Sequence, residues 1–171
     1  MAVPVLTHLR SLPRQRLAER VTAASYGTVL VLASLVVIEP DEVGSGVGWE
    51  LVTGVGVATW VAHLFAEIVG DHLRHSAALG RTEITRAMRD GFPILIATVL
   101  PAVMLLLGRL DVLAHRLALW ASVAVAVVQL AGLGGFVGLA VSAHRESAWR
   151  FAGMTTMFGV TVVSVKVVLG H

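Results

Sequence analysis

The sequence has no cysteine, one tyrosine and little charge. Without cysteine, the chain can form no disulfide, thiolate metal site or cysteine nucleophile. Only 14% of its 171 residues are charged, whereas a soluble domain carries about a quarter. Hydrophobic residues make up 56% of the chain, and the mean hydropathy is +0.82. This composition predicts an integral membrane protein with one compact domain.

Motifs for phosphate binding and for hydrolysis are also lacking. The glycines lie in apolar runs or in the loop at residues 39–50 and form no phosphate cradle. The serines have no base and acid in a recognisable catalytic motif. The net charge is only +2, and the arginines separate apolar runs rather than forming a phosphate-binding face. We therefore expect neither an enzyme nor a nucleic-acid partner.

Five apolar segments are each able to cross a bilayer, which takes about 20 helical residues. We expect them at residues 21–38, 50–71, 92–108, 117–142 and 151–169. The prediction is an all-α, polytopic membrane protein in which residues 21–171 form a single five-helix transmembrane domain. Residues 1–20 form a basic leader, and residues 72–91 form a short cytosolic segment. Pro101 is expected to kink the third span.

The basic residues predict the orientation through the positive-inside rule. With the N-terminus inside, the outer side holds only Arg109, Arg116 and Lys166. The inner side holds ten arginines, namely Arg10, Arg14, Arg16, Arg20, Arg74, Arg81, Arg86, Arg89, Arg145 and Arg150. We therefore expect a multi-pass protein of the cytoplasmic (inner) membrane with its C-terminus outside.

A polar stripe runs along the second span. His63, Glu67, Asp71 and His75 recur every fourth residue, so they share one helix face, about 6 Å apart along the axis. Ionisable side chains inside a membrane are costly and usually face a partner or a wet cavity. Imidazole and carboxylate suit divalent transition metals and can relay protons. Glu67 and His63 are therefore candidate ligands for a divalent metal ion such as Fe²⁺ or Mn²⁺.

Two interpretations of this stripe remain open. In the first, His63, Glu67 and Asp71 line a transport path together with Tyr26 and Gln129. In the second, His63 and Glu67 are a buried polar pair that bonds to each other, to Tyr26 or to Gln129 and only joins helices. A mutation that removes the charge of Glu67 distinguishes the two.

The chain is expected to form a homodimer in the lipid bilayer. Five short helices can hardly enclose a polar path, and an odd number of spans gives no internal inverted repeat. A symmetric dimer with two striped helices near its axis is the economical solution. Gly134 and Gly138 have the small-xxx-small spacing that permits close helix packing.

The layout resembles the vacuolar iron transporter family. Tyr26-Gly27 falls at the position of that family's Asp-Gly pair, and the segment 62–67, AHLFAE, at its Ser-Met-Ala-x-Gly-Glu motif. Leu100-Pro101 is similar to the proline of its third span. The resemblance implies five spans, an N-terminus inside and transport of a divalent metal. Here the first-span aspartate is Tyr26, the methionine ligand position is His63, and the family's Glu-rich helices are reduced to residues 72–91.

A second resemblance is to the bacterial relatives of the lysosomal potassium channel. Residues 20–27, RVTAASYG, are similar to the Arg-x-x-Ala-Phe-Ser-Asp-Gly signature, without its Phe and Asp. Trp60-Val61-Ala62-His63 is similar to that family's Trp-x-x-His. This resemblance implies a potassium or proton channel-like protein, although that fold has six spans per repeat.

The leading hypothesis is a transporter of divalent metal cations, coupled to protons. The alternatives are an accessory or assembly subunit of a membrane complex and a channel-like protein. Neither the ion nor the direction of transport follows from the residues.

Reporter fusions test the orientation. A reporter fused after His171 should be active only outside the cytoplasm, and one inserted at Gly80 only inside, because the arginines flank the segment around Gly80. Swapped activities would rule out the five-span arrangement.

Overall fold

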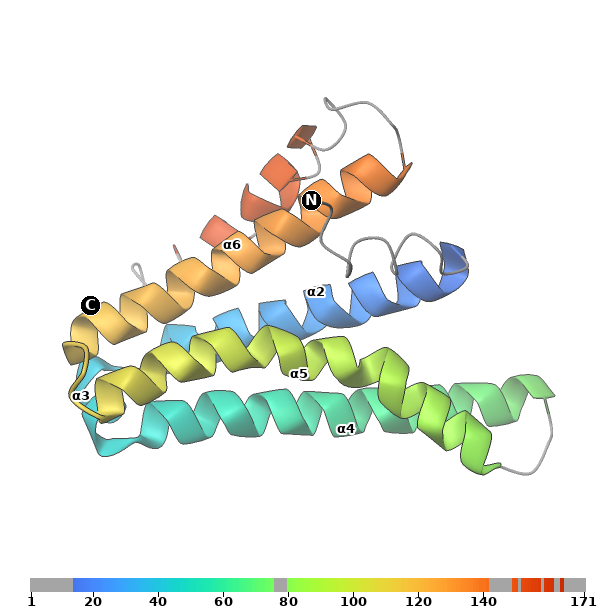
Figure 1. Ribbon diagram of the computed structural model, residues 1–171, viewed down its shortest axis with the longest axis horizontal. Helices are drawn as coiled ribbons and strands as arrows, with labels where there is room; N and C mark the ends of the chain where they lie inside the picture. The colour runs from blue at the N-terminus through green and yellow to red at the C-terminus, as the bar shows by residue number, and fades with distance from the viewer. Residues whose placement is uncertain are drawn as a thin grey trace, which may run out of the picture.

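The structure, a computed structural model, describes residues 14–75, 80–141, 149–150, 152–157, 159–161 and 164. Within them it contains helices and no strand. The helices are α2 (Arg14–Val37), α3 (Pro40–Ser45), α4 (Val47–His75), α5 (Arg81–Arg109) and α6 (His115–Val141), shown in Figure 1. The all-α prediction is confirmed.

Four of these helices are long and apolar enough to cross a membrane. The apolar stretches are Leu17–Val37, Val47–His72, Ile84–Arg109 and His115–Ala140. They correspond to the first four predicted spans and fit a multi-pass membrane protein.

The helices extend beyond the predicted spans on the arginine-rich side. α2 already begins at Arg14, within the predicted leader, and α5 begins at Arg81, within the predicted segment 72–91. Hydropathy marks the part of a helix that suits lipid, whereas arginine and glutamate also have good helix propensity outside it. α4 and α5 have 29 residues each, about 43 Å at 1.5 Å per residue. Both therefore exceed a hydrocarbon core of about 30 Å.

The predicted fifth span, residues 151–169, is described only in part, at residues 152–157, 159–161 and 164. Its described residues are helical and lie beside α6 in Figure 1. A Cβ built at Gly159 would be 3.5 Å from Leu130 of α6 and 3.7 Å from Leu32 of α2. This part of the chain therefore packs against both helices. Residues 1–13 of the predicted leader also lie outside the description.

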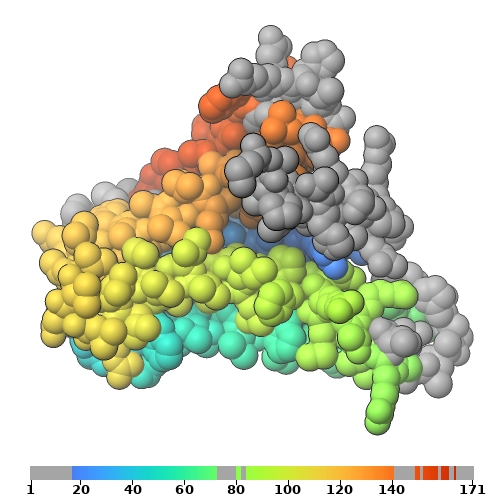
Figure 2. Space-filling view, in the orientation of Figure 1, coloured from blue at the N-terminus to red at the C-terminus, as the bar shows by residue number. Residues whose placement is uncertain are grey.

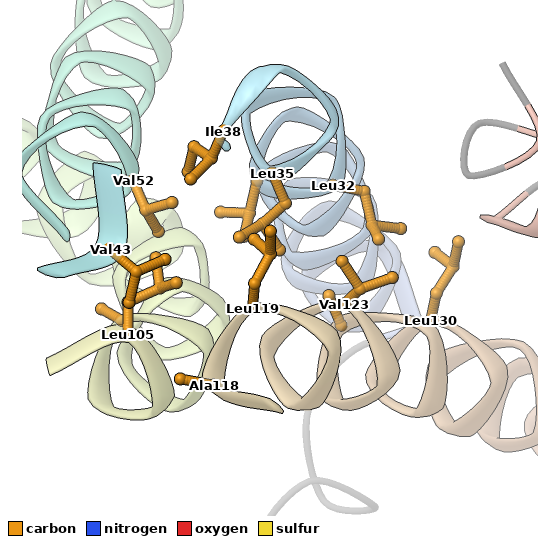
Figure 3. Close-up of a cluster of buried hydrophobic side chains, with 13 residues drawn as sticks. Leu32, Leu35, Ile38, Val43, Val52, Leu105, Ala118, Leu119, Val123 and Leu130 are labelled. Atoms are coloured by element: carbon orange, nitrogen blue, oxygen red, sulfur yellow. The ribbon is translucent and has the colours of Figure 1, made fainter. Parts of the chain in front are cut away.

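The apolar core occupies the end of the bundle near α3. It draws side chains from all five labelled helices (Figure 3). Its most deeply buried large members are Leu32, Leu35, Ile38, Val43, Val52 and Leu105. Because lipid tails are as apolar as these side chains, close packing rather than removal from water holds such a core together in a membrane.

α5 is the central helix and contacts α2, α4 and α6. Glycines on its neighbours bring the backbones together. A Cβ at Gly27 of α2 would lie 3.1 Å from the Cα of Ile94, and one at Gly56 of α4 would clash with the side chain of Thr98. Small residues at such crossings permit the close approach that membrane helices use for packing.

Two prolines lie inside α5, at positions 93 and 101. Each removes a backbone hydrogen bond and can bend the helix. Figure 1 shows α5 bent in its first half, which contains Pro93. Near Pro101, the hydroxyl of Ser122 on α6 lies 3.0 Å from the Pro101 carbonyl oxygen and joins the two helices.

A matched pair of glycine substitutions tests this packing. Gly56→Leu should destabilise the protein by about 1–3 kcal/mol, because the new side chain must displace Thr98. Gly54→Leu, two residues earlier on α4, should be neutral or stabilising, since a Cβ there meets nothing within 4 Å. Thermal unfolding in detergent measures the stability of both variants. Equal effects of the two substitutions would contradict the close crossing of α4 and α5 at Gly56.

Candidate functional site

His63 and Glu67 lie together on α4, as their four-residue spacing predicts. His63 Nε2 is 3.7 Å from Glu67 Oε2, and the two side chains are 29% and 20% exposed. This face of α4 is directed toward α5. A Cβ built at Gly91 of α5 would be 3.0 Å from Cδ2 of His63, so the absence of a side chain at Gly91 makes room for the imidazole.

Two further helices add carboxylates to this pair. Glu19 comes from α2 and Asp90 from α5, and each has an oxygen within 4.8 Å of the other and of Glu67. Asp90 is buried, with 5% of its side chain exposed. The cluster of Glu19, His63, Glu67 and Asp90, called the acidic cluster below, thus joins three helices at the end of the bundle opposite α3.

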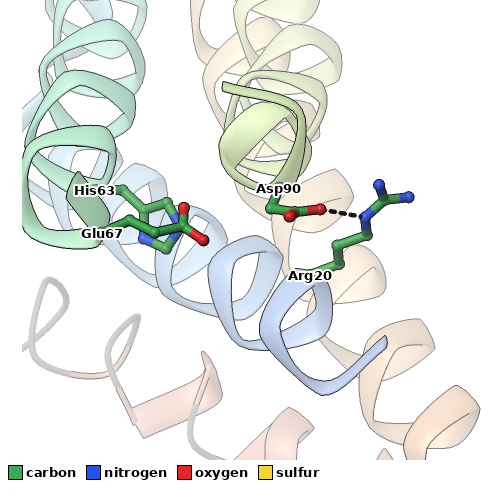
Figure 4. Close-up of polar contacts among 4 residues, drawn as sticks. All are labelled: Arg20, His63, Glu67 and Asp90. Atoms are coloured by element: carbon green, nitrogen blue, oxygen red, sulfur yellow. Dashed lines mark hydrogen bonds and ion pairs between the residues drawn. The ribbon is translucent and has the colours of Figure 1, made fainter. Parts of the chain in front are cut away.

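An ion pair positions Asp90 in this cluster. The guanidinium of Arg20 donates a hydrogen bond from Nε to Asp90 Oδ1 at 3.0 Å (Figure 4). The Arg20 side chain is 26% exposed, so water screens this pair less than a pair on the open surface. The contact links residues separated by 70 positions in the chain and connects α2 to α5.

The geometry of the carboxylates fits a cation. Two ligands of one ion lie at most about 4.4 Å apart for bonds of about 2.2 Å, and about 5 Å apart for the longer bonds of a Ca²⁺-sized ion. The carboxylate oxygens of the acidic cluster lie within 4.8 Å of one another, which suits a Ca²⁺-sized ion. A smaller ion would require these oxygens to move slightly closer together. The positive charge of Arg20 would repel a bound cation. This repulsion would lower the affinity of the site for the cation and favour its release.

The other predicted path residues lie in different surroundings. Asp71 is half-buried one turn beyond Glu67 on α4. Tyr26 is 56% exposed, and its neighbour Gly27 is the residue that meets α5. Gln129 lines a cavity between α2, α5 and α6, and its Oε1 is buried with no hydrogen-bond donor among the described residues. The side chain of His75 is outside the description.

Gly134 and Gly138 are buried within the single chain. A described neighbour on this face is Ala152, whose Cβ would be 3.8 Å from a Cβ at Gly135. At Gly135, α6 therefore packs against the chain's own helical segment around Ala152.

Three residues of the site were not predicted from the sequence: Glu19, Arg20 and Asp90. The first two lie in the predicted leader, and Asp90 lies in the predicted cytosolic segment. One signal was present, because Asp90 is an acidic residue that directly precedes the apolar run beginning at Phe92. An isolated carboxylate at such a boundary needs a partner once the helix enters the bundle.

Two cavities adjoin the acidic cluster. One of about 530 Å³ lies between α2, α5 and α6, and one of about 660 Å³ lies between α4 and α5. Arg20, Arg89 and Phe92 line both. The second cavity also contains Trp60, whose buried indole N–H has no acceptor among the described residues.

Comparisons of the chain with protein-family models, curated proteins and solved structures found no match. The two family resemblances therefore remain predictions.

A double-mutant cycle tests the ion pair. Asp90→Asn or Arg20→Gln alone should destabilise the protein by about 3 kcal/mol, because either change leaves the opposite charge partly buried and unpaired. The double variant should lose less than the sum, with a coupling of about 1–3 kcal/mol. Additive losses in detergent unfolding would show that the two side chains act independently.

Proposed function

We propose that this chain is an integral membrane transporter of divalent metal cations of the Fe²⁺ and Mn²⁺ class. One observation carries the proposal: carboxylate oxygens of Glu19, Glu67 and Asp90, on three different helices, lie within 4.8 Å of one another. His63 adds an imidazole nitrogen 3.7 Å from Glu67. This mixture of oxygen and nitrogen ligands suits Mn²⁺ and Fe²⁺.

Mutual repulsion of the carboxylates supports a cation at this place. Carboxylates that share a site cannot all remain ionised without a compensating positive charge. Arg20 supplies one such charge at Asp90. A divalent ion among Glu19, Glu67 and Asp90 would supply more. Glu19 is exposed, Glu67 half-buried and Asp90 buried, so the ion would neutralise the two carboxylates that lie within the bundle.

Protons provide the coupling in this proposal. A carboxylate or imidazole must lose its proton to bind a metal ion, so metal and protons compete for the same atoms. When the ion leaves, Glu67 and His63 can take up protons in its place. Alternate loading with metal and with protons would link the two fluxes in opposite directions.

The orientation rests on the arginine distribution. We place the N-terminus in the cytoplasm and the chain in the inner membrane, because ten basic residues then lie inside. The acidic cluster, at the second turn of α2 and the third turn of α5, would be reached from the cytoplasm. The core near α3 would lie toward the outer surface and separate the site from that side.

A second copy of the chain would cover the apolar face of α4, which lies opposite His63 and Glu67 on this helix. Only 17% of the apolar window of α4 is buried. Its exposed side chains at four-residue spacing are Val57, Val61, Phe65 and Val69. We place the dimer axis beside this face of α4, so that the helices that carry His63 and Glu67 lie near each other.

A potassium or proton channel-like protein is the second candidate. One observation favours it, because Arg20 and Trp60, which carry the second resemblance, line the same cavity. The exposed face of α4 would equally suit an accessory subunit that is covered by a partner. Flux of Mn²⁺, K⁺ and protons into liposomes that contain only this protein distinguishes the three functions.

Glu67→Gln tests the metal site. The amide keeps the shape of the side chain but cannot supply a charged ligand, so Mn²⁺ affinity and Mn²⁺ flux should fall at least about tenfold. Calorimetry with Mn²⁺ and proteoliposome flux measure the two. The matched control is Glu50→Gln on the same helix, whose side chain is 64% exposed, and it should behave as the wild type.

His63→Ala provides a second check. Two ligands of one ion act as a unit, so Glu67→Gln combined with His63→Ala should cost much less than the sum of the single losses. A Glu67→Gln protein that stays folded with unchanged flux and unchanged metal content would overturn the proposed function.

A further inference from the structure

We propose that the cavity between α2, α5 and α6 binds one anionic phospholipid, with an acyl chain in the cavity and the phosphate at Arg20 and Arg89. This site adjoins the acidic cluster through Arg20, which is also paired with Asp90, but the inference does not depend on transport.

The cavity has the dimensions of one leaflet. Its volume is about 530 Å³, within the range of about 300–1,000 Å³ that is usual for ligand sites. Its wall on α2 runs from Leu17 to Thr28, about 16 Å along the helix axis at 1.5 Å per residue. Half of a hydrocarbon core of about 30 Å is almost the same length.

The walls are apolar along most of this length. Pro93 and Ile96 come from α5, and Leu133 and Phe136 from α6. In Figure 2, atoms of α2 are visible in the space between α5 and α6, at the bottom of the hollow. An acyl chain can pack against these four side chains without needing a hydrogen-bond partner.

Positive charge is concentrated at one end of the cavity. Arg20 gives its Nε–H to Asp90, and a guanidinium has further N–H donors. Arg89 is exposed and makes no ion pair with any described side chain. The two guanidinium groups therefore fit a phosphodiester, which accepts hydrogen bonds from arginine and carries the opposite charge.

The positive charge of Arg20 and Arg89 also disfavours two other occupants of the cavity, residues 1–13 and a second copy of the chain. Residues 1–13 of the chain contain Arg10 and no acidic residue, so this segment would be repelled by the two arginines. The exposed face of α4 on a second copy is apolar and offers no anion. An anionic lipid satisfies both the apolar walls and the charged end.

Polar groups at the end of the cavity opposite the arginines distinguish an acyl chain from a polar ligand. Thr28 already donates its hydroxyl to the Ala24 carbonyl oxygen at 2.8 Å, whereas Gln129 Oε1 has no donor among the described residues. If an acyl chain fills this end, Gln129→Leu should leave lipid binding unchanged or strengthen it. A loss of binding in this variant would indicate a polar ligand and overturn the proposal.

A pair of glycines permits a direct test of the acyl-chain site. Gly132 lines the cavity, and a Cβ built there meets nothing within 4 Å. Gly132→Phe should therefore fill the cavity without disturbing the helices and abolish binding of dioleoyl phosphatidylglycerol, measured by native mass spectrometry of the full chain. Gly54→Phe is the control, since its Cβ also meets open space but lies on α4, outside the cavity.

A second pair tests the headgroup site. Arg89→Gln should weaken phosphatidylglycerol binding about fivefold, the factor expected for one basic residue, and remove the preference over phosphatidylcholine. Arg86→Gln, an exposed arginine of α5 outside the cavity, should retain both. Equal binding of the two lipids by the wild type, or undiminished binding by Gly132→Phe, would overturn the proposal.

Cross-linking identifies the occupant. A photoactivatable residue at Leu133, which lines the cavity, should capture phosphatidylglycerol from vesicles that contain this lipid. Capture of residues 1–13 or of a second copy in place of lipid would show that the cavity is filled by protein and would contradict the proposal.

Discussion

The ion pair between Arg20 and Asp90 connects α2 and α5 at the end of the bundle where packing is least able to do so. The buried side chains near it are small, among them Ala23, Ala24 and Ala87, and offer few dispersion contacts. A charge-assisted hydrogen bond of 3.0 Å between partly buried groups compensates for this. It also fixes Asp90 beside Glu67, so the acidic cluster depends on it.

The opposite end of the bundle is held by a different interaction. There the large residues of the core interlock around Leu35 and Leu105, and glycines such as Gly56 permit close helix crossings. The molecule therefore combines a closely packed apolar end with a polar end that contains the acidic cluster. A binding site for a transported ion needs this division, because binding and release must change charge without disrupting the fold.

Hydropathy and spacing predicted the helices and the pair of His63 and Glu67, because both are local properties of the sequence. The position of a residue on a helix face follows from its number. Which helices meet does not follow from residue numbers, so the positions of Glu19, Arg20 and Asp90 beside this pair could not be predicted from spacing. Tyr26 was predicted to line the path or to bond to the pair of His63 and Glu67, and its side chain is exposed. Gln129 was expected there as well, yet it lines the neighbouring cavity.

The separation of Arg20 and Asp90 by 70 residues has a consequence for biogenesis. At about 5–20 residues per second, translation takes roughly 4 to 14 s to produce the second partner after the first. During this interval, α2 and α4 are in the translocon or the bilayer with their charged groups unmatched by α5. The docking of α5 is therefore the assembly step that pairs the charge of Arg20, and a chain arrested before Asp90 would present this charge without its partner to the membrane quality-control machinery.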